Sequence, residues 1–397
     1  MASRSGNIPF LFGIRGISAL YVLGFHLNYM VLAANAGRVP HLYHQLTDWI
    51  RYGDFRVAAF FVISGYLLML PATRTPGWLL PRGVGGFLRR RAQRLLIPYY
   101  AAFALSLVLF LVWAHVVREP VGAKMLVIAT VTHLLLIHNL HPQTMLLVND
   151  TLWNVALEFQ CYILFALVLL PAVRRWGPWP QLIAVTVFAL APHFLLHGFL
   201  DWVRPWFVAL YAMGVAVCAL ANPAYPSLGA LERRVPWGAL WLTTTLAMPI
   251  VVWASGIDTP YGDGWFENIL LGIAVSAFLV YARLGTPGNC GTLARLAIGA
   301  LQWTPLRKLG RFSYSIYLIH FPLLRLAVAL TARLTSNFWL EALLAFGLFA
   351  PLSIALAYVF HLLFERPFQD RRAGLLVPLN GARTMTANEP MWATRSS

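Results

Sequence analysis

The segment "FGIRGISALYVLGFHL" (residues 12–27) has the apolar composition of a membrane-spanning helix, yet it contains Arg15 and His26. Eleven residues separate these two side chains. That is close to three helical turns, so both project from the same face of a helix. Ionisable residues are costly in hydrocarbon and are retained there mainly where they serve a function. The segment therefore predicts a membrane helix with a polar, functional face.

The composition of the whole chain agrees with this interpretation. Of its 397 residues, 59% are hydrophobic and 11% are charged, which excludes an ordinary soluble domain and indicates a polytopic membrane protein. The net charge of +16 is distributed between apolar runs, which argues against a nucleic-acid-binding face. The three cysteines have no metal-ligand spacing, so we expect neither a metal site nor a disulfide framework.

Ten apolar stretches are long enough to cross a bilayer, which requires about 20 residues. They lie at residues 10–32, 55–73, 95–115, 152–171, 180–198, 205–221, 237–255, 266–283, 312–333 and 342–363. A further apolar stretch, 125–148, contains three histidines, an asparagine and a proline, and makes a poor span.

The basic residues predict how these spans are oriented, because Lys and Arg collect on the cytoplasmic side. With a cytoplasmic N-terminus and a segment 125–148 that does not cross, 21 of the 30 basic residues fall inside. If 125–148 crossed, the later basic loops would fall outside. The expected fold is therefore an all-α polytopic membrane protein with about ten transmembrane helices and both termini in the cytoplasm.

Segment 125–148 is then expected to be re-entrant or half-inserted. It should line a protein-walled or wet cavity, because irregular backbone is tolerated at membrane depth only there. Residues 1–369 form one membrane-embedded domain in this interpretation. Residues 370–397 form a basic cytoplasmic tail that we expect to be disordered.

Depth in the membrane predicts that His26 and Glu158 meet. His26 lies about six residues before the outer end of its span, and Glu158 about six residues after the outer start of 152–171, so both lie roughly 9 Å below the outer boundary. A carboxylate beside an imidazole would fix its tautomer, as a general base requires. Arg15 lies roughly 16 Å deeper on the same face, toward the cytoplasm.

Structural interpretations of these residues stand beside the functional ones. Arg15 could extend its guanidinium to the inner headgroups, and His26 and His320 could be buried hydrogen-bonding residues. The cluster in "FLRRRAQRLLIPYY" (87–100) could anchor a helix at the inner surface. This cluster contains more arginines than are needed to orient a span in the membrane, which favours a phosphate site. The arginines concerned are Arg89, Arg90, Arg91 and Arg94.

Six blocks in order resemble the membrane-bound acyltransferase family 3, the bacterial inner-membrane O-acyltransferases. The resemblance covers residues 10 to about 369, and six ordered blocks are far more specific than any one of them. The blocks are "IRGISALYVLGFH" with Arg15 and His26, "FRVAAFFVISGYLL", "FLRRRAQRLLIPYY" with Arg91 and Arg94, "LWNVALEFQCYILF" with Trp153, Glu158 and Tyr162, "LGRFSYSIYLIHFPLL" and "FERPF". The fourth block departs from the family in carrying a single carboxylate where a polar pair is common.

The resemblance implies transfer of an acyl group, commonly acetyl from acetyl-CoA, to a hydroxyl of a carbohydrate or a glycosylated small molecule. Acyl-CoA would be a donor substrate, with no cofactor bound permanently. His26, supported by Glu158 and with Arg15 steadying the donor, would act as general base or as a covalent acyl relay. The four clustered arginines would hold the phosphates. Candidates for lining the substrate cavity are Trp153, Tyr162, Tyr66 and His320.

Two alternatives come from other classes. A transporter or flippase would use the same buried charges as an ion relay, but the sequence shows neither an inverted repeat nor paired broken spans. A non-catalytic membrane scaffold would leave the buried Arg15, His26 and Glu158 without a purpose. The acceptor, the acyl chain length and the oligomeric state are left open by the sequence.

Overall fold

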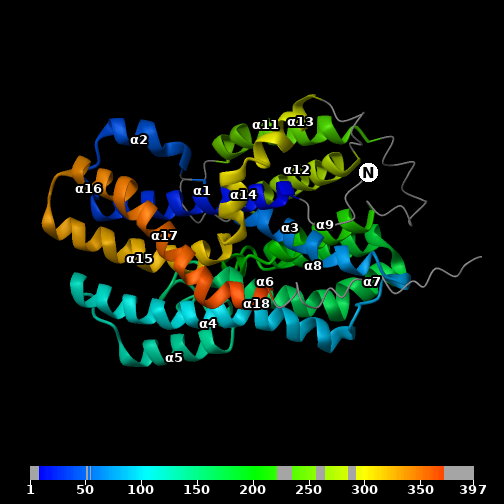
Figure 1. Ribbon diagram of the computed structural model, residues 1–397, viewed down its shortest axis with the longest axis horizontal. Coiled ribbons are helices and arrows are strands. Elements are labelled where there is room, and N and C mark those ends of the chain that lie inside the picture. The colour runs from blue at the N-terminus through cyan, green and yellow to red at the C-terminus, as the bar shows by residue number, and fades with distance from the viewer. Residues whose placement is uncertain are drawn as a thin grey trace, which may run out of the picture.

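The computed structural model describes residues 9–50, 52–53, 55–220, 235–255, 264–284 and 292–370. These residues form helices joined by turns, and no strand occurs among them. Most of the long helices run roughly along the longest axis of the molecule, as Figure 1 shows. The prediction of an all-α protein is confirmed for this part of the chain.

The first half of the chain contains the N-terminal span and the hairpin that follows the second span. Its elements are α1 (Pro9–Ala34), α2 (His41–Thr47), η1 (Asp48–Ile50), α3 (Phe55–Ala72), η2 (Pro76–Trp78), α4 (Gly83–Val117), α5 (Ala123–Leu134), η3 (His138–Leu140), α6 (Leu152–Leu164), η4 (Phe165–Leu169), α7 (Leu170–Trp176) and α8 (Pro178–Leu195).

The second half supplies the remaining spans. Its described elements are η5 (Asp201–Val203), α9 (Trp206–Leu220), α11 (Trp237–Ala254), α12 (Trp265–Leu284), α13 (Thr292–Leu301), α14 (Thr304–Arg311), α15 (Ser313–Leu334), α16 (Phe338–Leu344), η7 (Ala345–Phe349), α17 (Ala350–Phe360), η8 (His361–Glu365) and α18 (Arg366–Asp370). The segments η4, η7 and η8 are π-helical turns within longer helices.

Eight helices in the described residues are long and apolar enough to cross a membrane, so the chain is a multi-pass membrane protein. They correspond to eight of the ten predicted spans. The other two predicted spans, 55–73 and 205–221, are also helical, as α3 and α9, but their apolar helical stretches, Val57–Ala72 and Trp206–Leu220, are shorter than 18 residues. The number of ten crossings and the cytoplasmic position of the termini remain predictions. Most of the predicted tail, residues 371–397, lies outside the described residues.

The short helices α3 and α9 pack against each other at the centre of the molecule. Two glycines allow their backbones to approach closely. A Cβ atom at Gly214 would lie 1.9 Å from the Val62 carbonyl oxygen, and one at Gly65 would lie 2.1 Å from the Tyr211 carbonyl oxygen. Almost all of α9 is buried, so protein surrounds this helix.

Segment 125–148 contains a short helix and a reversal of the chain. Helix α5 has 12 residues, about 18 Å, which is too short to cross a hydrocarbon core of about 30 Å. It packs beside α4, where the hydroxyl groups of Tyr99 and Tyr100 donate to the carbonyls of His133 and Leu134. The chain then turns at Leu136, which has a φ of 57°, and returns to the start of α6. This geometry agrees with the prediction that the segment does not cross.

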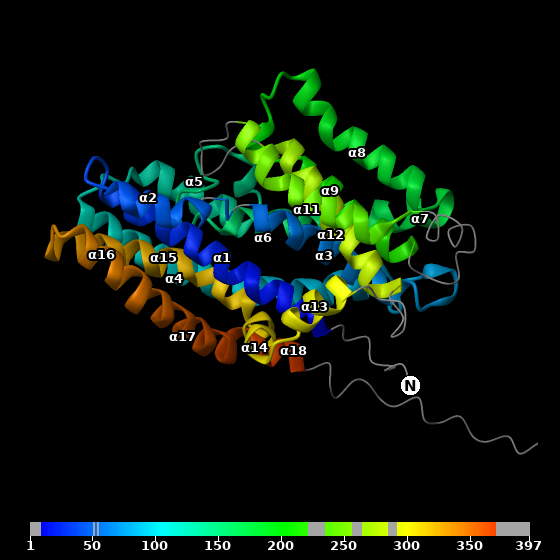
Figure 2. The same ribbon diagram turned by 90° about the horizontal axis from the view of Figure 1, so that it is seen from above.

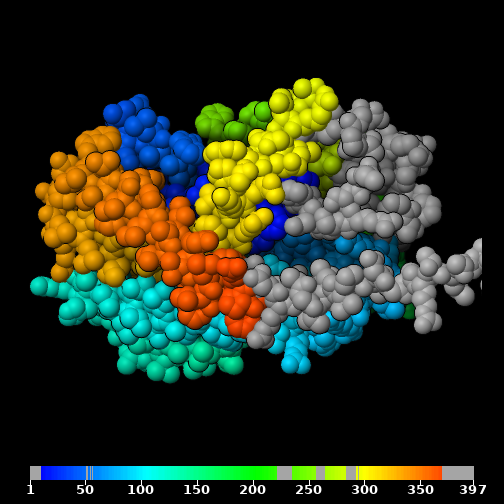
Figure 3. Space-filling model, in the orientation of Figure 1, coloured from blue at the N-terminus to red at the C-terminus, as the bar shows by residue number. Residues whose placement is uncertain are grey.

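The outermost helices expose apolar side chains, as a lipid-facing surface requires. Phe188 on α8 is 80% exposed and Trp253 on α11 is 83% exposed. In the view of Figure 2, α8 lies at one margin of the molecule and α17 at the opposite margin. Figure 3 shows the last span (orange) reaching the first half of α4 (cyan), and η8 and α18 make contacts with α4 there.

Candidate active site

A cavity of about 310 Å³ lies where segments from all six sequence blocks meet. Its walls come from α1, α3, α4, α6, α15 and η8, together with the turn after α3. Convergence of distant segments on one polar cavity is typical of a binding site. The side chains that could bind a ligand by charge or hydrogen bonding are Arg15, Ser64, Arg74, Arg91, Arg94, Glu158, Tyr162, Tyr314 and Glu365.

The charges around this cavity are mostly positive. Arg15, Arg74, Arg91 and Arg94 contribute four guanidinium groups, whereas the carboxylates are Glu158 and Glu365. Such a surface attracts a polyanion, and arginine pairs well with phosphate oxygens.

Aromatic rings hold two of these guanidinium groups. The Arg15 guanidinium lies 5.6 Å from the centroid of the Phe60 ring, and that of Arg91 lies 5.7 Å from the centroid of the Tyr162 ring. The Nε atom of Arg15 is buried and has no hydrogen-bond partner in the described structure. The Arg15 guanidinium therefore contributes its charge to the cavity wall, whereas this nitrogen is closed to solvent.

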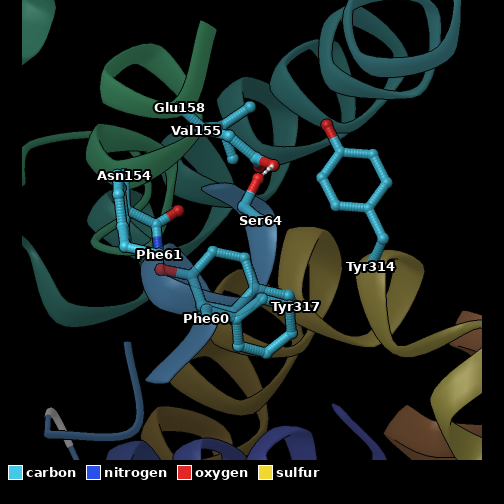
Figure 4. Close-up of a pocket in the computed structure, with 8 residues that line it drawn as sticks. All are labelled: Phe60, Phe61, Ser64, Asn154, Val155, Glu158, Tyr314 and Tyr317. Atoms are coloured by element: carbon cyan, nitrogen blue, oxygen red, sulfur yellow. Dashed lines mark hydrogen bonds between the residues drawn. The ribbon is translucent and has the colours of Figure 1, made fainter. Parts of the chain in front are cut away.

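Glu158 is tied to two hydroxyl groups at the wall of the cavity. One oxygen, Oε1, accepts hydrogen bonds from Ser64 Oγ at 3.0 Å and from Tyr162 OH at 2.6 Å. Tyr162 follows Glu158 by four residues and therefore lies on the same face of α6. Figure 4 shows Ser64 on α3 pointing at the carboxylate, with the ring of Tyr314 on the other side. This carboxylate is fixed in position and faces the cavity.

A smaller pocket of about 30 Å³ adjoins the large cavity and shares Phe60, Ser64, Glu158 and Tyr314 with it. Its remaining walls are Phe61, Asn154, Val155 and Tyr317 (Figure 4). The ring centroid of Tyr317 lies 6.0 Å from that of His320. Tyr317, one wall of the small pocket, therefore packs beside a buried histidine, which itself lines neither pocket.

That histidine is hydrogen-bonded to His26. The Nδ1 atom of His26 lies 2.9 Å from Nε2 of His320, and the two residues are 6% and 1% exposed. On its other side, His320 Nδ1 lies 2.9 Å from the carbonyl oxygen of Ile316 and 3.1 Å from that of Tyr317. The Phe321 ring packs edge-on against His26 at 5.2 Å between centroids. The two imidazoles thus form a fixed, buried pair.

The C-terminal end of α1, beyond His26, is held by buried polar contacts. Tyr43 on α2 donates from its hydroxyl to Asn28 Oδ1 at 2.8 Å. Burial raises the pKa of the Tyr43 phenol, so this group stays protonated and remains a donor. Farther along, Asn35 Nδ2 donates to Glu341 Oε2 at 2.6 Å. These contacts join α1 to α2 and α16.

The structure places the residues predicted from sequence in three groups. Arg15, Arg91, Arg94, Glu158 and Tyr162 line the large cavity. His26 and His320 form the buried pair beyond the small pocket. The third group lies outside the cavity walls and consists of Arg89, Arg90, Tyr66 and Trp153.

The residues outside the cavity have other positions. Arg89 is exposed and Arg90 partly exposed on α4. Tyr66 is 1% exposed, and Trp153 is 3% exposed with the Arg204 guanidinium stacked 4.6 Å from its ring centroid. Core packing therefore describes Tyr66 and Trp153 better than contact with a substrate.

The predicted contact between His26 and Glu158 is not the arrangement in this structure. The described side-chain partners of Glu158 are Ser64 and Tyr162, and the described side-chain partner of His26 is His320, with a backbone contact to Val22 beside it. Equal depth places two residues at the same level, but it does not set the direction in which each helix presents its side chain.

Sequence reasoning missed four polar residues of the cavity wall. These are Ser64, Arg74, Tyr314 and Glu365. Glu365 is held by Ser315 Oγ at 2.6 Å and by His361 Nδ1 at 2.8 Å. Ser64, Tyr314 and Glu365 lie within the sequence blocks described above, in "ISGY", "FSYSIY" and "FERPF". Their position in these blocks was the signal by which the sequence could have identified them.

The fold and the site define a multi-pass membrane protein with an arginine-lined cavity and a separate pair of buried, hydrogen-bonded histidines. The acyltransferase domain of the membrane-bound acyltransferase family 3 matches residues 8–362, so the chain belongs to this family. The prediction of an acyltransferase is thereby confirmed at the level of the family.

Two curated relatives match most of this chain. The peptidoglycan O-acetyltransferase OatA of Listeria monocytogenes is 23% identical over 364 residues, which cover 84% of this chain and 52% of OatA. YrhL of Bacillus subtilis, a candidate peptidoglycan O-acetyltransferase, is 26% identical over 354 residues, which cover 84% of this chain and 51% of YrhL. The chain spans about half the length of these relatives. No solved structure matches it significantly.

Proposed function

We propose that the protein is an integral membrane O-acetyltransferase of the bacterial inner membrane. It moves an acetyl group from acetyl-CoA to a hydroxyl group of a carbohydrate. The observation that carries this proposal is the arginine-lined cavity, together with the adjoining small pocket, whose wall residue Tyr317 packs beside His320. The family and the names of the relatives support the reaction class.

The large cavity fits the phosphate-bearing part of the donor. Its volume of about 310 Å³ lies at the lower end of the range for ligand pockets, so the cavity holds part of a molecule as large as acetyl-CoA. Arg91 and Arg94 would bind phosphate oxygens, and Arg15, which also lines the cavity, would add its positive charge. The other two arginines of the cluster, Arg89 and Arg90, would add only long-range attraction.

The small pocket fits the uncharged thioester end of the donor. Phe60, Phe61 and Tyr317 give it aromatic walls, which suit an apolar acyl group. In this proposal the thioester would lie against Tyr317, the wall residue that packs beside His320. Glu158 lines both spaces and stands beside the route that the donor would take.

His26 performs the proton transfer in this proposal. It accepts the proton of the acceptor hydroxyl as the oxygen attacks the thioester carbonyl, and it returns that proton to the sulfur when the C–S bond breaks. In the covalent route, a His26 nitrogen attacks the thioester first, CoA leaves as the thiol, and the acceptor hydroxyl then removes the acetyl group. Both routes use the same residues, and both consume one thioester and one hydroxyl.

The relatives suggest the first acceptor to test. Both are named for peptidoglycan O-acetylation, so hydroxyl groups of peptidoglycan sugars are the proposed acceptor class. A transporter or flippase remains the competing function. The decisive difference is that an O-acetyltransferase forms an ester bond and a transporter does not.

The experiment uses sealed vesicles from cells that express the wild type or His26→Ala at matched levels. His115→Ala is the control, because His115 is exposed at the far end of α4 and lines neither pocket. Acetyl-labelled CoA is supplied on the cytoplasmic face with peptidoglycan fragments on the other, and label is followed into protein, acetate and glycan.

Ester-linked label on the glycan from the wild type and His115→Ala, with about 100-fold less from His26→Ala, supports the proposal. Equal transfer by His26→Ala would remove His26 from the chemistry. No transfer by the wild type would refute acetyl-CoA as donor and would favour the transporter function.

A further inference from the structure

The hydrogen bond between His26 and His320 joins residues that are 294 positions apart in the chain. His26 lies on α1 and His320 lies on α15, and these helices pack against each other over much of their length. Both side chains are almost completely buried. The protein therefore fixes the relative position of the two rings, and the direction of their hydrogen bond can be worked out from the groups around them.

The backbone of α15 determines which nitrogen of His320 carries a proton. Nδ1 of His320 faces the carbonyl oxygens of Ile316 at 2.9 Å and Tyr317 at 3.1 Å. Carbonyl oxygens only accept, so Nδ1 must be the N–H of the ring. A neutral imidazole has one N–H, which leaves Nε2 of His320 as an acceptor. A doubly protonated ring would place an unpaired charge in the protein interior, which is costly.

The tautomer of His26 follows from that of His320. The contact of 2.9 Å between His26 Nδ1 and His320 Nε2 is a hydrogen bond only if His26 donates. Nδ1 of His26 then carries the hydrogen, and Nε2 of His26 has the free lone pair. Nε2 is therefore the nitrogen that can accept a proton or attack a thioester.

We propose that His320 is a positioning residue that holds His26 in the tautomer with Nε2 unprotonated and fixes the direction of that nitrogen. This inference rests on the proposed function. When His26 takes a proton at Nε2, its Nδ1–H still donates to His320, so the same hydrogen bond persists in the cationic form. Both ring nitrogens of His320 are engaged within the protein, which leaves neither for a substrate.

A third segment of the chain holds the His320 region of α15 in place. Asn149 Nδ2 donates to the Leu318 carbonyl at 2.9 Å, and the Thr151 hydroxyl shares its one hydrogen between Asn149 Oδ1 at 2.8 Å and the Tyr317 carbonyl at 3.1 Å. These two donors lie in the turn between η3 and α6, directly after the predicted re-entrant segment. The Tyr317 carbonyl is thus shared between Thr151 and His320, so the turn and the histidine pair form one network.

The test compares His320→Gln with His320→Phe. A glutamine side chain has an NH₂ group that can donate to the α15 carbonyls and an oxygen that can accept from His26, so it retains both functions of His320. Phenylalanine fills similar space and retains neither. His133→Phe is the control, because His133 is also fully buried, and its Nδ1 faces the carbonyl of the residue four positions earlier, Ala129, at 2.7 Å.

Transfer kinetics give the first readout, on variants shown to be folded by their melting temperatures. We expect His320→Phe to lower kcat by about 100-fold with KM for acetyl-CoA within about threefold, and His320→Gln to recover at least about tenfold of that loss. His133→Phe should retain kcat. If His320→Phe retains more than about a third of the wild-type kcat, or if His320→Gln and His320→Phe are equally impaired, the positioning role is refuted.

Nitrogen NMR of histidine-labelled protein in bilayers gives a second readout that needs no activity. The His26 signals are assigned as those lost in His26→Ala. The proposal requires a protonated Nδ1 and an unprotonated Nε2 in the wild type and in His320→Gln, and loss of this single tautomer in His320→Phe. The opposite tautomer in the wild type would overturn the inference. An enzyme that transfers no acetyl group but shows the expected tautomer would refute the proposed function alone.

Discussion

Replacing Arg91 by glutamine tests whether the cavity binds the phosphates of the donor. Arg91 lines the cavity, and its guanidinium lies near the rings of Phe87 and Tyr162, each 5.7 Å away. A hydrogen bond to a charged partner contributes about 1.5–3 kcal/mol, and about 1.4 kcal/mol corresponds to a factor of ten. We therefore expect Arg91→Gln to raise KM for acetyl-CoA by roughly 10- to 150-fold.

The effect on kcat should be small, within about threefold, because an interaction made equally in the ground state and the transition state changes KM alone. Arg91→Lys keeps the charge but loses the planar fork of donors, so its KM should be intermediate. Arg89→Gln is the matched control. Arg89 belongs to the same cluster on the same helix, but it is exposed and does not line the cavity.

The assay is initial-rate acetyl transfer in vesicles over a range of acetyl-CoA concentrations, at low and at physiological ionic strength. A diffuse surface charge would be screened by salt, whereas a contact inside the cavity would be screened much less. Equal increases in KM for Arg89→Gln and Arg91→Gln would refute the reasoning, because the cluster would then act only as a general positive surface. A loss of kcat with unchanged KM in Arg91→Gln would refute it as well.

Two further predictions concern stability, measured by thermal unfolding of purified protein. Gly214→Ala should destabilise the protein by roughly 3 kcal/mol, because the new Cβ would meet the Val62 carbonyl. The control is Gly299→Ala, which has nothing within 4 Å of the new Cβ and should be neutral or stabilise by up to about 1 kcal/mol. Equal melting temperatures of the two variants would contradict the close packing of α3 and α9. Asn35→Leu should destabilise the protein by about 1–3 kcal/mol, because the buried carboxylate of Glu341 loses a hydrogen-bond donor. Adding Glu341→Leu should restore part of that lost stability. No recovery in the double variant would contradict a direct interaction between Asn35 and Glu341.

The sequence predicts the helical class and the positions of the spans well, because the apolar runs record burial in lipid or protein directly. It cannot separate these two surroundings. Residues 205–221 have the composition of a lipid-facing span, yet α9 is almost entirely surrounded by protein. The same ambiguity explains why the number of crossings does not follow from hydropathy alone.

Within the site, helical periodicity explains both the successes and the errors. Each residue turns the helix by about 100°, so Tyr162, four positions after Glu158, shares its face and lines the same cavity. Tyr66 lies only two positions from Ser64, so the two side chains point in nearly opposite directions, and Tyr66 faces the core. Its place in the block "FRVAAFFVISGYLL" had made Tyr66 a candidate.

The partner of His26 could not be predicted because it depends on the rotation of two distant helices. Depth pairs His26 with Glu158, and it places His320, about 13 residues before the outer end of its predicted span, roughly 11 Å deeper. Only the packing of α1 against α15 turns the two imidazoles toward each other. Uncharged residues such as Ser64 and Tyr314 were even harder to predict as cavity residues, because serine and tyrosine are common in helices that bind no ligand.

The π-helical turns η7 and η8 make the length of the last span as important as its side chains. A π turn accommodates more residues per turn than an α turn. Losing one residue from η8 would rotate everything beyond it by about 100° and carry Glu365 away from Ser315 and out of the cavity wall. Single-residue insertions and deletions, which a lipid-facing helix end tolerates easily, should therefore be rare in homologues between Phe338 and Glu365.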